Sequence, residues 1–430
     1  RFRGVTGVQT CALPIYTLRH EQEAAVSQTL AYFKSHLGSE FLWNAKPRFG
    51  KTLAAYDLIK RLDAFKALVL TNRPAVANSW YDDFERFVAG NTDYKFVSST
   101  DSLKDRNAMS RDEFIEYLGQ HDDARQIAFI SLQDLKGAKA FGGEHTKLQW
   151  VADLKWDIII IDEAHEGVDT FKTDFAFNNL HTKWTLHLSG TPFKAIAGGH
   201  FCAEQIYNWS YADEQRAKAD WNSDSEAENP YENLPQLNMF TYQMSKMVLD
   251  VIKEGVTIDG ENYDYAFDLN EFFAANDKYE FVHKDAVEAW LDTLTKNEKY
   301  PFSTKELRNE LKHTFWLLDR VNSAKALKKL LETHPTFENY GIVLAAGSGG
   351  AYCSDEGTEN LRSLAAVRKA IADHERTITL SVGQLTTGVT VPEWTGVMML
   401  CNAKSPALYM QAAFRAQNPY SWTDLRTGTH

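Results

Sequence analysis

The feature that most constrains the fold is a run of four isoleucines, Ile158–Ile161, which Asp162, Glu163, Ala164 and His165 follow without a break. A short, continuous apolar run predicts a strand that is buried on both faces of a parallel sheet. The sequence therefore places two carboxylates directly after a buried strand. Asp162 in this position can hold Mg²⁺, and Glu163 can orient and deprotonate an attacking water. The alternative needs no chemistry, because acidic residues are also favoured at an ordinary helix N-terminus.

Apolar runs of strand length recur along the chain and alternate with stretches of helical spacing. This alternation predicts an α/β fold in which helices cover both faces of parallel sheets. The predicted helices include residues 20–36 and 52–62. The predicted strands are residues 41–43, 67–70, 127–130, 156–161, 185–188, 314–318, 341–345, 377–382 and 396–400.

The chain is too long for one compact core, because its 430 residues exceed the usual size of a single domain. Its formal net charge of −12 at first argues against a nucleic-acid partner. Residues 195–310, however, hold 23 Asp and Glu against 10 Lys and Arg, so the rest of the chain is nearly neutral. Net negative charge therefore does not prevent the rest of the chain from binding the phosphate backbone of a nucleic acid. The sequence predicts two α/β units around an acidic insertion.

The first residues of the chain are set apart from the rest. Residues 5–15 resemble the translation of a common sequencing-adapter primer. They have neither the continuous apolar core nor the small-residue cleavage site of a secretory signal. We therefore expect residues 1–15 to be non-native, and we exclude them from the fold prediction.

Cysteine usage and hydropathy both indicate a cytoplasmic protein. No apolar run approaches the ~18 residues of a membrane span, so no membrane partner is expected. The chain has four scattered cysteines and no C-x-x-C pair, which predicts neither a disulfide framework nor a zinc ribbon. These cysteines are Cys11, Cys202, Cys353 and Cys401.

A candidate phosphate loop lies at residues 44–52, where Asn-Ala-Lys-Pro-Arg-Phe-Gly-Lys-Thr follows a predicted strand and opens a predicted helix. In that setting backbone N–H groups and the helix N-terminus converge on an anion. Lys51 would reach the β- and γ-phosphates of a nucleotide, and the Thr52 hydroxyl would ligate Mg²⁺. The pattern G-x-x-x-x-G-K-[ST] is incomplete, because Ala45 stands where the first glycine belongs. The alternative is a helix start with a basic first turn.

Taken together, the Gly-Lys-Thr loop and the Asp-Glu-Ala-His segment resemble motifs I and II of superfamily 2 helicases and translocases. Further segments of the chain resemble the family's other motifs and follow one another in the family's order. They correspond to the segment ahead of motif I, motif Ia, the next backbone-contacting motif, and motifs III, V and VI. These segments are residues 18–22, 68–74, 130–133, 188–192, 385–392 and 411–418. Within the superfamily, residues 48–52 and 411–419 look most like the motor part of bacterial type III-like restriction proteins.

The resemblance implies a P-loop NTPase with two RecA-like parallel-sheet domains and an acidic insertion between them. Residues 16–194 would form the ATP-binding domain, residues 195–310 the insertion and residues 311–430 the second domain. A second RecA-like domain normally continues beyond the helix of motif VI, so we expect residues 311–430 to be incomplete at their C-terminal end. The implied cofactors are ATP and Mg²⁺.

The resemblance also implies roles for individual residues. The expected catalytic residues are Lys51, Thr52, Asp162, Glu163, Gln411 and Arg415, with Thr52 and Asp162 holding the metal. The nucleotide would be bound by Gln22, which reads the adenine, and by Pro47, Arg48, Phe49, Gly50, Lys51, Thr52 and Gly388. Hydrolysis would be coupled to movement through His165, Ser189 and Thr191. The nucleic-acid backbone would be held by Thr71, Arg73, Ser131, Thr386 and Thr387.

Motifs V and VI depart from the family pattern. Thr390 stands where motif V usually has an Asp, and in motif VI Phe414 replaces a Gly and Asn418 replaces the final Arg. Arg415 is the remaining candidate in that motif for an arginine finger, the group that neutralises charge in the transition state of phosphoryl transfer. The alternative for Arg415 is an ordinary solvated helix residue.

The function that the sequence predicts is nucleic-acid-stimulated ATP hydrolysis that drives translocation or unwinding, with DNA favoured as the track. The chain would be the motor of a bacterial restriction or defence protein, with any nuclease or methyltransferase module or subunit outside it. Two alternatives remain open. One is a nucleotide-gated nucleic-acid clamp or scaffold with little hydrolysis, and the other is an RNA helicase.

Overall fold

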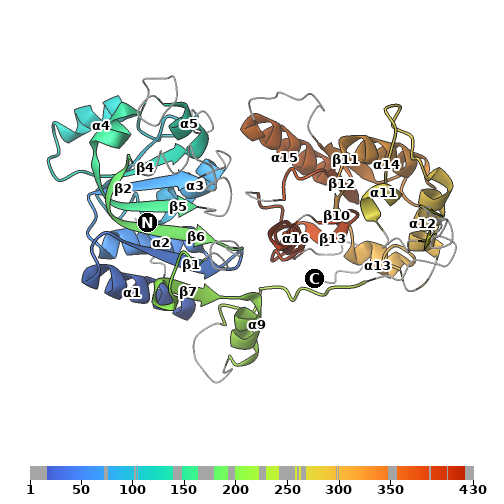
Figure 1. Ribbon diagram of the computed structural model, residues 1–430, viewed down its shortest axis with the longest axis horizontal. Coiled ribbons are helices and arrows are strands. Elements are labelled where there is room, and N and C mark those ends of the chain that lie inside the picture. Colours follow the sequence, from blue (N-terminus) through green and yellow to red (C-terminus); the bar gives the residue numbers. More distant parts are fainter. Residues whose placement is uncertain are drawn as a thin grey trace, which may run out of the picture. The chain divides into compact units, whose positions relative to one another are not determined.

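The chain divides into two compact units, Arg1–Glu214 and Gln215–His430 (Figure 1). The structure is a computed structural model, and the residues it describes are 17–71, 76–100, 103, 105–138, 148–162, 179–191, 199–221, 229–241, 257–258, 261–262, 268–296, 298, 300–346, 356–386, 389–403 and 405–421. Each unit is built on a sheet of parallel strands. The predicted α/β fold with two parallel sheets is therefore confirmed, whereas the exact domain limits stay a prediction.

The first unit holds a seven-stranded sheet in the order β3-β4-β2-β5-β6-β1-β7. All of its neighbouring strands run parallel. The strands are β1 (Ser39–Ala45), β2 (Lys66–Thr71), β3 (Tyr94–Val97), β4 (Arg125–Ser131), β5 (Lys155–Asp162), β6 (His181–Ser189) and β7 (Ile206–Trp209). The helical segments are α1 (His20–Ser35), α2 (Lys51–Arg61), α3 (Ala77–Phe87), α4 (Arg111–Leu118), α5 (Leu132–Gly137), α6 (Gln149–Asp153), the short 3-10 helix η4 (Ala203–Gln205) and α9 (Tyr211–Ala219).

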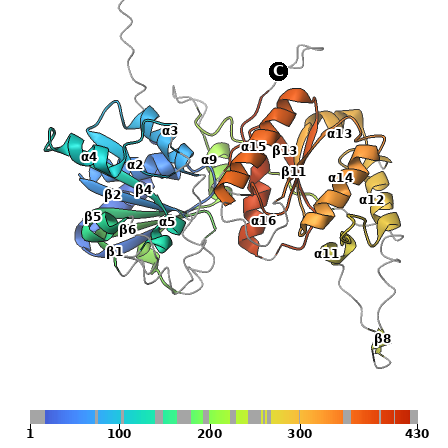
Figure 2. The same ribbon diagram turned by 90° about the horizontal axis from the view of Figure 1, so that it is seen from above.

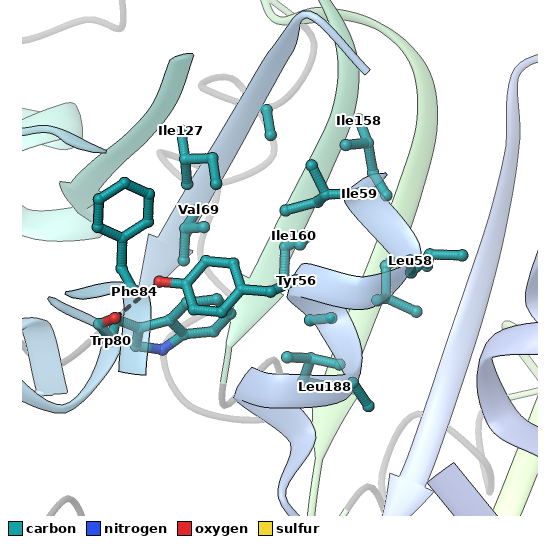
Figure 3. Packing of buried hydrophobic residues seen from close by; sticks show 14 of the residues in the cluster. Tyr56, Leu58, Ile59, Val69, Trp80, Phe84, Ile127, Ile158, Ile160 and Leu188 are labelled. Carbon is teal, nitrogen blue, oxygen red and sulfur yellow. Dashed lines mark hydrogen bonds between the residues drawn. The ribbon is translucent and has the colours of Figure 1, made fainter. Parts of the chain in front are cut away.

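The isoleucine run forms the centre of this sheet, in β5. Ile158 and Ile160 face the core formed with α1, α2 and α3 (Figure 3). Ile159 and Ile161 face the core formed with α5 and α6. All four side chains are buried. Alternate residues of a strand point to opposite faces, so only a strand covered on both sides can be apolar at every position.

The second unit holds a four-stranded parallel sheet in the order β11-β12-β10-β13. Helices α12 and α14 cover one face, and α15 and α16 cover the other (Figure 2). The helical segments are α11 (Leu269–Phe272), α12 (Lys284–Lys296), α13 (Lys305–Glu310), α14 (Val321–Thr333), α15 (Glu356–Asp373), α16 (Pro406–Ala413) and the 3-10 helix η5 (Phe414–Ala416). The strands are β10 (His313–Leu317), β11 (Gly341–Ala345), β12 (Thr377–Ser381), β13 (Trp394–Met399) and an antiparallel pair, β8 (Thr257–Ile258) with β9 (Glu261–Asn262).

Every predicted strand falls on a strand of one of these two sheets, but the two edge strands β3 and β7 were not predicted. Each has only four residues, and β7 lies in the acidic segment 195–310. Within the described residues, no helix is both long enough and apolar enough to cross a membrane.

A buried histidine makes the stability of the second unit depend on pH. His313 is the first residue of the central strand β10, and its Nδ1 lies 3.0 Å from the Thr377 hydroxyl. Burial, with a smaller contribution from Lys312 and Arg376, lowers the pKa of His313 to about 4. Below about pH 6.5 His313 is protonated in the unfolded chain but stays neutral in the folded unit until about pH 4. The free energy of unfolding of the second unit therefore decreases as the pH falls from about 6.5 to 4.

The free energy of unfolding decreases between pH 7 and pH 4, and we predict that this decrease is about 3 kcal/mol smaller in His313→Gln than in the wild type. The measurement is urea unfolding of the second unit at a series of pH values. His374→Asn, which changes an exposed histidine of the same unit, is the control and should keep the wild-type slope. Equal slopes for His313→Gln and the wild type would contradict the prediction.

Candidate functional site

Five strands of the first sheet end at the same edge and bring candidate site residues together. In the parallel register Thr71 lies beside both Ser131 and Asp162. Further along the sheet, Asn44 lies beside Ser189, whose neighbour Leu188 is opposite Asp162. Carboxyl ends of parallel strands form the edge at which open α/β sheets bind ligands. The end of β1, which leads into the phosphate loop, and the carboxylate at the end of β5 therefore lie at the same edge of the sheet.

The loop between β1 and α2 contains two residues in the left-handed backbone region. Arg48 and Gly50 both have positive φ, at 72° and 83°, and Gly50 is the N-cap of α2. A Cβ atom at Gly50 would lie 2.4 Å from Nε2 of Gln22, so a larger residue would displace the Gln22 amide from the Phe49 carbonyl. The glycine of the Gly-Lys-Thr pattern is thus favoured by its left-handed backbone conformation.

Lys51 and Thr52 form the first turn of α2, where backbone N–H groups have no partner within the helix. The Lys51 ammonium donates to the carbonyl of Ala45 at 2.8 Å and to that of Lys46 at 3.4 Å. The Lys51 ammonium therefore lies near the start of the loop, next to the carbonyls of the residues that precede the turn. A cation and a helix N-terminus in this arrangement suit a phosphate group.

Two side chains from the start of α1 fix the other side of the loop. The carbonyl of Phe49 accepts from Nε2 of Gln22 at 2.8 Å and from the Arg19 guanidinium at 2.7 Å. The Oε1 atom of Gln22 in turn accepts from the backbone N–H of Arg19 at 2.9 Å. Gln22, expected to read an adenine, is thus hydrogen-bonded through both ends of its amide within the loop region. Its role toward adenine stays a prediction.

A buried ion pair ties the loop to α9. The Lys46 ammonium lies 2.8 and 2.7 Å from the two carboxylate oxygens of Glu214, and both side chains are almost fully buried. Burial lowers the pKa of Lys46, and the Glu214 carboxylate opposes that shift. The backbone N–H of Lys46 also donates to the Trp209 carbonyl at 3.0 Å, at the end of β7. The loop is therefore anchored by a segment about 160 positions further along the chain.

The carboxylate at the end of β5 is held by an aromatic side chain. Oδ2 of Asp162 accepts from the indole Nε1 of Trp80, on α3, at 2.9 Å. Asp162 is 8 % exposed and Trp80 is fully buried. Glu163 and His165, the other predicted residues of this segment, lie outside the described residues.

Two oxygen ligands at this edge are of the kind that hold Mg²⁺ together with substrate phosphates. In the part of the chain that the structure describes, no group of three or more His, Cys, Asp or Glu could hold a metal. Mg²⁺ in phosphate-binding sites is held by one or two protein oxygens, the substrate phosphates and water. The hydroxyl of Thr52 and the carboxylate of Asp162 are oxygens of that kind.

The segment after β6 packs against the phosphate loop. The backbone N–H of Thr191 donates to Oγ of Ser189 at 3.2 Å, and both residues are buried. A Cβ atom at Gly190 would lie 3.2 Å from Cδ of Pro47. Gly190 therefore lies against Pro47 of the loop, between Ser189 and Thr191, the residues expected to couple hydrolysis to movement. The coupling itself stays a prediction.

The predicted nucleic-acid contacts are buried where the structure describes them. Thr71 is fully buried, and the Ser131 hydroxyl caps α5 by accepting from the Asp134 N–H at 3.0 Å and donating to the Asp134 carboxylate at 2.7 Å. In the second unit the Thr386 hydroxyl donates to the Gly383 carbonyl at 2.6 Å. Arg73 and Thr387 lie outside the described residues, as does Gly388 of the nucleotide set. Their contacts to nucleic acid or nucleotide stay predictions.

The second unit brings the segments that resemble motifs V and VI together. Arg415 is 8 % exposed, and its guanidinium donates to the carbonyl of Val389 and, at 3.3 Å, to that of Gln411. The Asn418 amide donates to the carbonyls of Val391 at 2.9 Å and Arg415 at 2.8 Å. Arg415 is thus not an exposed helix residue, as its alternative reading required, and its role as an arginine finger stays a prediction.

Four residues of the site were not predicted. Arg19 lies inside the predicted segment 18–22, and Lys46 lies inside the predicted loop at residues 44–52. Both residues were therefore in recognised segments, although no role was predicted for them. Trp80 and Glu214 lie 82 and 168 positions from the residues they contact. No local signal in the sequence connects them to the site.

We predict that Glu214→Gln lowers the free energy of unfolding of the first unit by about 3 kcal/mol, because it leaves the buried Lys46 ammonium without its counter-charge. Thermal or urea unfolding measures the effect. The double variant Lys46→Met/Glu214→Leu, which removes both charges, should recover most of the loss. Glu204→Gln, at an exposed glutamate nearby in sequence, should change stability by no more than about 0.5 kcal/mol. A double variant no more stable than Glu214→Gln would contradict the prediction.

Comparison with known proteins confirms the resemblance that the motifs indicated. Residues 15–194 match the family model described as "Type III restriction enzyme, res subunit". A curated relative from Mycoplasma pneumoniae, "Putative type II restriction enzyme and methyltransferase RM.MpnORF110P C-terminus", is 26% identical over 466 aligned positions. That alignment covers 94% of this chain and 62% of the relative.

The fold also resembles that of a solved restriction enzyme. The structure described as "ATP-dependent Type ISP restriction-modification enzyme LlaBIII bound to DNA" superposes with a TM-score of 0.56 at 15% sequence identity. The match covers 94% of this chain but 27% of that chain. At this identity the likeness shows the fold alone, and it supports two RecA-like units. The chain thus spans less than two thirds of the length of either relative.

Proposed function

From the res-subunit match over residues 15–194 and the geometry of the sheet edge, we propose that this chain is an ATP-dependent nucleic-acid translocase or helicase. One observation carries the proposal. A Gly-Lys-Thr loop with a left-handed glycine opens α2 at the same sheet edge where β5 ends in the buried carboxylate of Asp162. A cation, a helix N-terminus and a carboxylate at one edge are the groups that magnesium–nucleotide chemistry requires.

The residues of the first unit would divide the work of binding and hydrolysis. Lys51 would exchange its contacts with the Ala45 and Lys46 carbonyls for the β- and γ-phosphates. Thr52 and Asp162 would hold Mg²⁺, which neutralises charge on the phosphates when it is bound, and Glu163 would orient the attacking water. Gln22 would bind the adenine at the entrance of the loop.

The second unit would supply the groups that complete the reaction. Arg415 would leave the Val389 carbonyl to stabilise the transferred phosphoryl group, with Gln411 beside it. The exchange costs little in net hydrogen bonding, because one acceptor replaces another. Repeated cycles of ATP binding and hydrolysis would move the segments that carry Thr71, Ser131 and Thr386 along a nucleic-acid strand. Because these side chains are buried in this structure, they would have to become accessible to hold the strand.

We propose DNA rather than RNA as the track. The solved relative is described as bound to DNA, and the curated relative is described as a restriction enzyme and methyltransferase. Since the chain spans only part of either relative, a nuclease or methyltransferase would be an additional module or subunit. The chain would then act as the motor of a bacterial restriction or defence protein.

A second candidate function, a nucleotide-gated clamp with little hydrolysis, is favoured by one observation. Asn418 stands where the family has a second arginine, and its amide is bonded to the carbonyls of Val391 and Arg415. The position therefore holds segments of the second unit together and offers no second cation to a phosphate. A clamp would bind ATP and nucleic acid tightly without turnover.

The test is phosphate release with Mg·ATP, measured without nucleic acid and with double-stranded DNA, single-stranded DNA or single-stranded RNA. We predict stimulation by DNA and a loss of about 100-fold or more in Lys51→Ala, because a positioned charge on the transferred phosphate is removed. Lys34→Ala, at an exposed lysine on α1, should keep the wild-type rate.

Three outcomes separate the candidates. Stimulation by DNA that Lys51→Ala abolishes supports the motor, and stimulation that requires the 2′-hydroxyl of RNA supports an RNA helicase. Tight binding of ATP and polymer without turnover contradicts the motor and supports the clamp.

A further inference from the structure

The hydrogen bond between Trp80 and Asp162 links the helix α3 to the carboxyl end of β5. The indole of Trp80 has a single polar group, an N–H that can only donate. It points at Oδ2 of Asp162 over 2.9 Å, from a side chain that is fully buried. A buried donor of this kind fixes the rotation of the carboxylate about its last bond, because turning the carboxylate away would leave the N–H unpaired.

The position of Trp80 is in turn set by α2, the helix that begins at Lys51. The Tyr56 hydroxyl donates to the backbone carbonyl of Trp80 at 2.7 Å, and the two rings meet edge to face with centroids 5.3 Å apart (Figure 3). Burial raises the pKa of Tyr56 well above its usual range, so the hydroxyl stays protonated and remains a donor. A continuous chain of contacts therefore runs from the phosphate-loop helix through Tyr56 and Trp80 to Asp162.

The surrounding core leaves these contacts little room to rearrange. Phe84 packs against Tyr56 from one turn further along α3, with centroids 6.2 Å apart. Ile158 and Ile160 of β5 belong to the same core cluster as Tyr56 and Trp80 (Figure 3). Since buried side chains pack closely, the indole and the carboxylate are held at a fixed separation.

We propose that Trp80 is a positioning residue, which orients the Asp162 carboxylate for the divalent cation of a magnesium–nucleotide complex. The inference rests on the proposed function, because it assumes that Asp162 faces that cation. A partner that orients a metal-binding group, without touching the metal, changes metal affinity by about 10- to 100-fold when it is removed. The predicted effect is therefore on the cation and not on the nucleotide alone.

The test compares Trp80→Phe with Trp156→Phe. Trp156 lies on the same strand as Asp162 but in its first half, is 1 % exposed, and donates from its indole to the Val151 carbonyl at 2.9 Å. Both substitutions remove a buried indole N–H and leave a similar small cavity. Any difference between them therefore reports on the position of the indole and not on the loss of packing.

The measurement is the affinity of each variant for a fluorescent ATP analogue, taken in EDTA and then across a titration with Mg²⁺. For Trp80→Phe we expect the affinity in EDTA to stay at the wild-type value and the half-saturating Mg²⁺ concentration to rise by about 10- to 100-fold. Trp156→Phe should match the wild type in both. Trp80→Met, whose flexible apolar side chain adapts to the site and has no N–H, should repeat the result and serves if Trp80→Phe does not fold.

Equal Mg²⁺ dependence in Trp80→Phe and the wild type would overturn the inference, as would an equal shift in Trp156→Phe. The binding readout separates this failure from that of the proposed function. If wild-type phosphate release is absent but Trp80→Phe still shifts the Mg²⁺ titration, the motor is contradicted and the positioning role of Trp80 is supported.

Discussion

The site depends on the parallel register of β1, β2, β5 and β6, since that register brings their carboxyl ends to one edge of the sheet. The register is secured by side chains far from the chemistry. Because β5 is apolar on both faces, each isoleucine has a core to fill, and a slip of one residue would exchange the two faces and displace Asp162 along the edge. Burial of four isoleucines therefore determines where a carboxylate lies.

The phosphate loop is preorganised by contacts from two other parts of the chain and by its own glycine. The start of α1 holds the Phe49 carbonyl, the Lys46–Glu214 ion pair ties the loop to α9, and Gly50 adopts a left-handed conformation that places the first turn of α2. Each contact uses a buried or half-buried polar group, which is costly to leave unpaired. The same helix α2 then reaches Asp162 through Tyr56 and Trp80, so the loop and the carboxylate belong to one packed assembly.

The sequence was informative where function and packing are recorded in neighbouring residues. Strands such as β5 and β2 appear as short apolar runs because both of their faces are covered. The loop is visible because a glycine, a lysine and a threonine are adjacent in the sequence. The edge strands β3 and β7 were missed, because each has only four residues, too few to give a distinct pattern. Trp80 and Glu214 were not predicted for a different reason. Their partners lie 82 and 168 positions away, and only the folded chain brings them together. Phe414 and Asn418 were recognised as departures from motif VI, but the internal hydrogen bonds of Asn418 became visible only in the structure.

The central claim is that the carboxyl edge of the first sheet binds a magnesium–nucleotide complex. A crystal structure of the chain with Mg²⁺ and a non-hydrolysable ATP analogue tests it most directly. The account predicts phosphates against the backbone N–H groups at the start of α2, Lys51 moved from the Ala45 carbonyl to the phosphates, and a metal ion between Thr52 and Asp162. A nucleotide bound elsewhere, with Lys51 still on the Ala45 carbonyl, would contradict it.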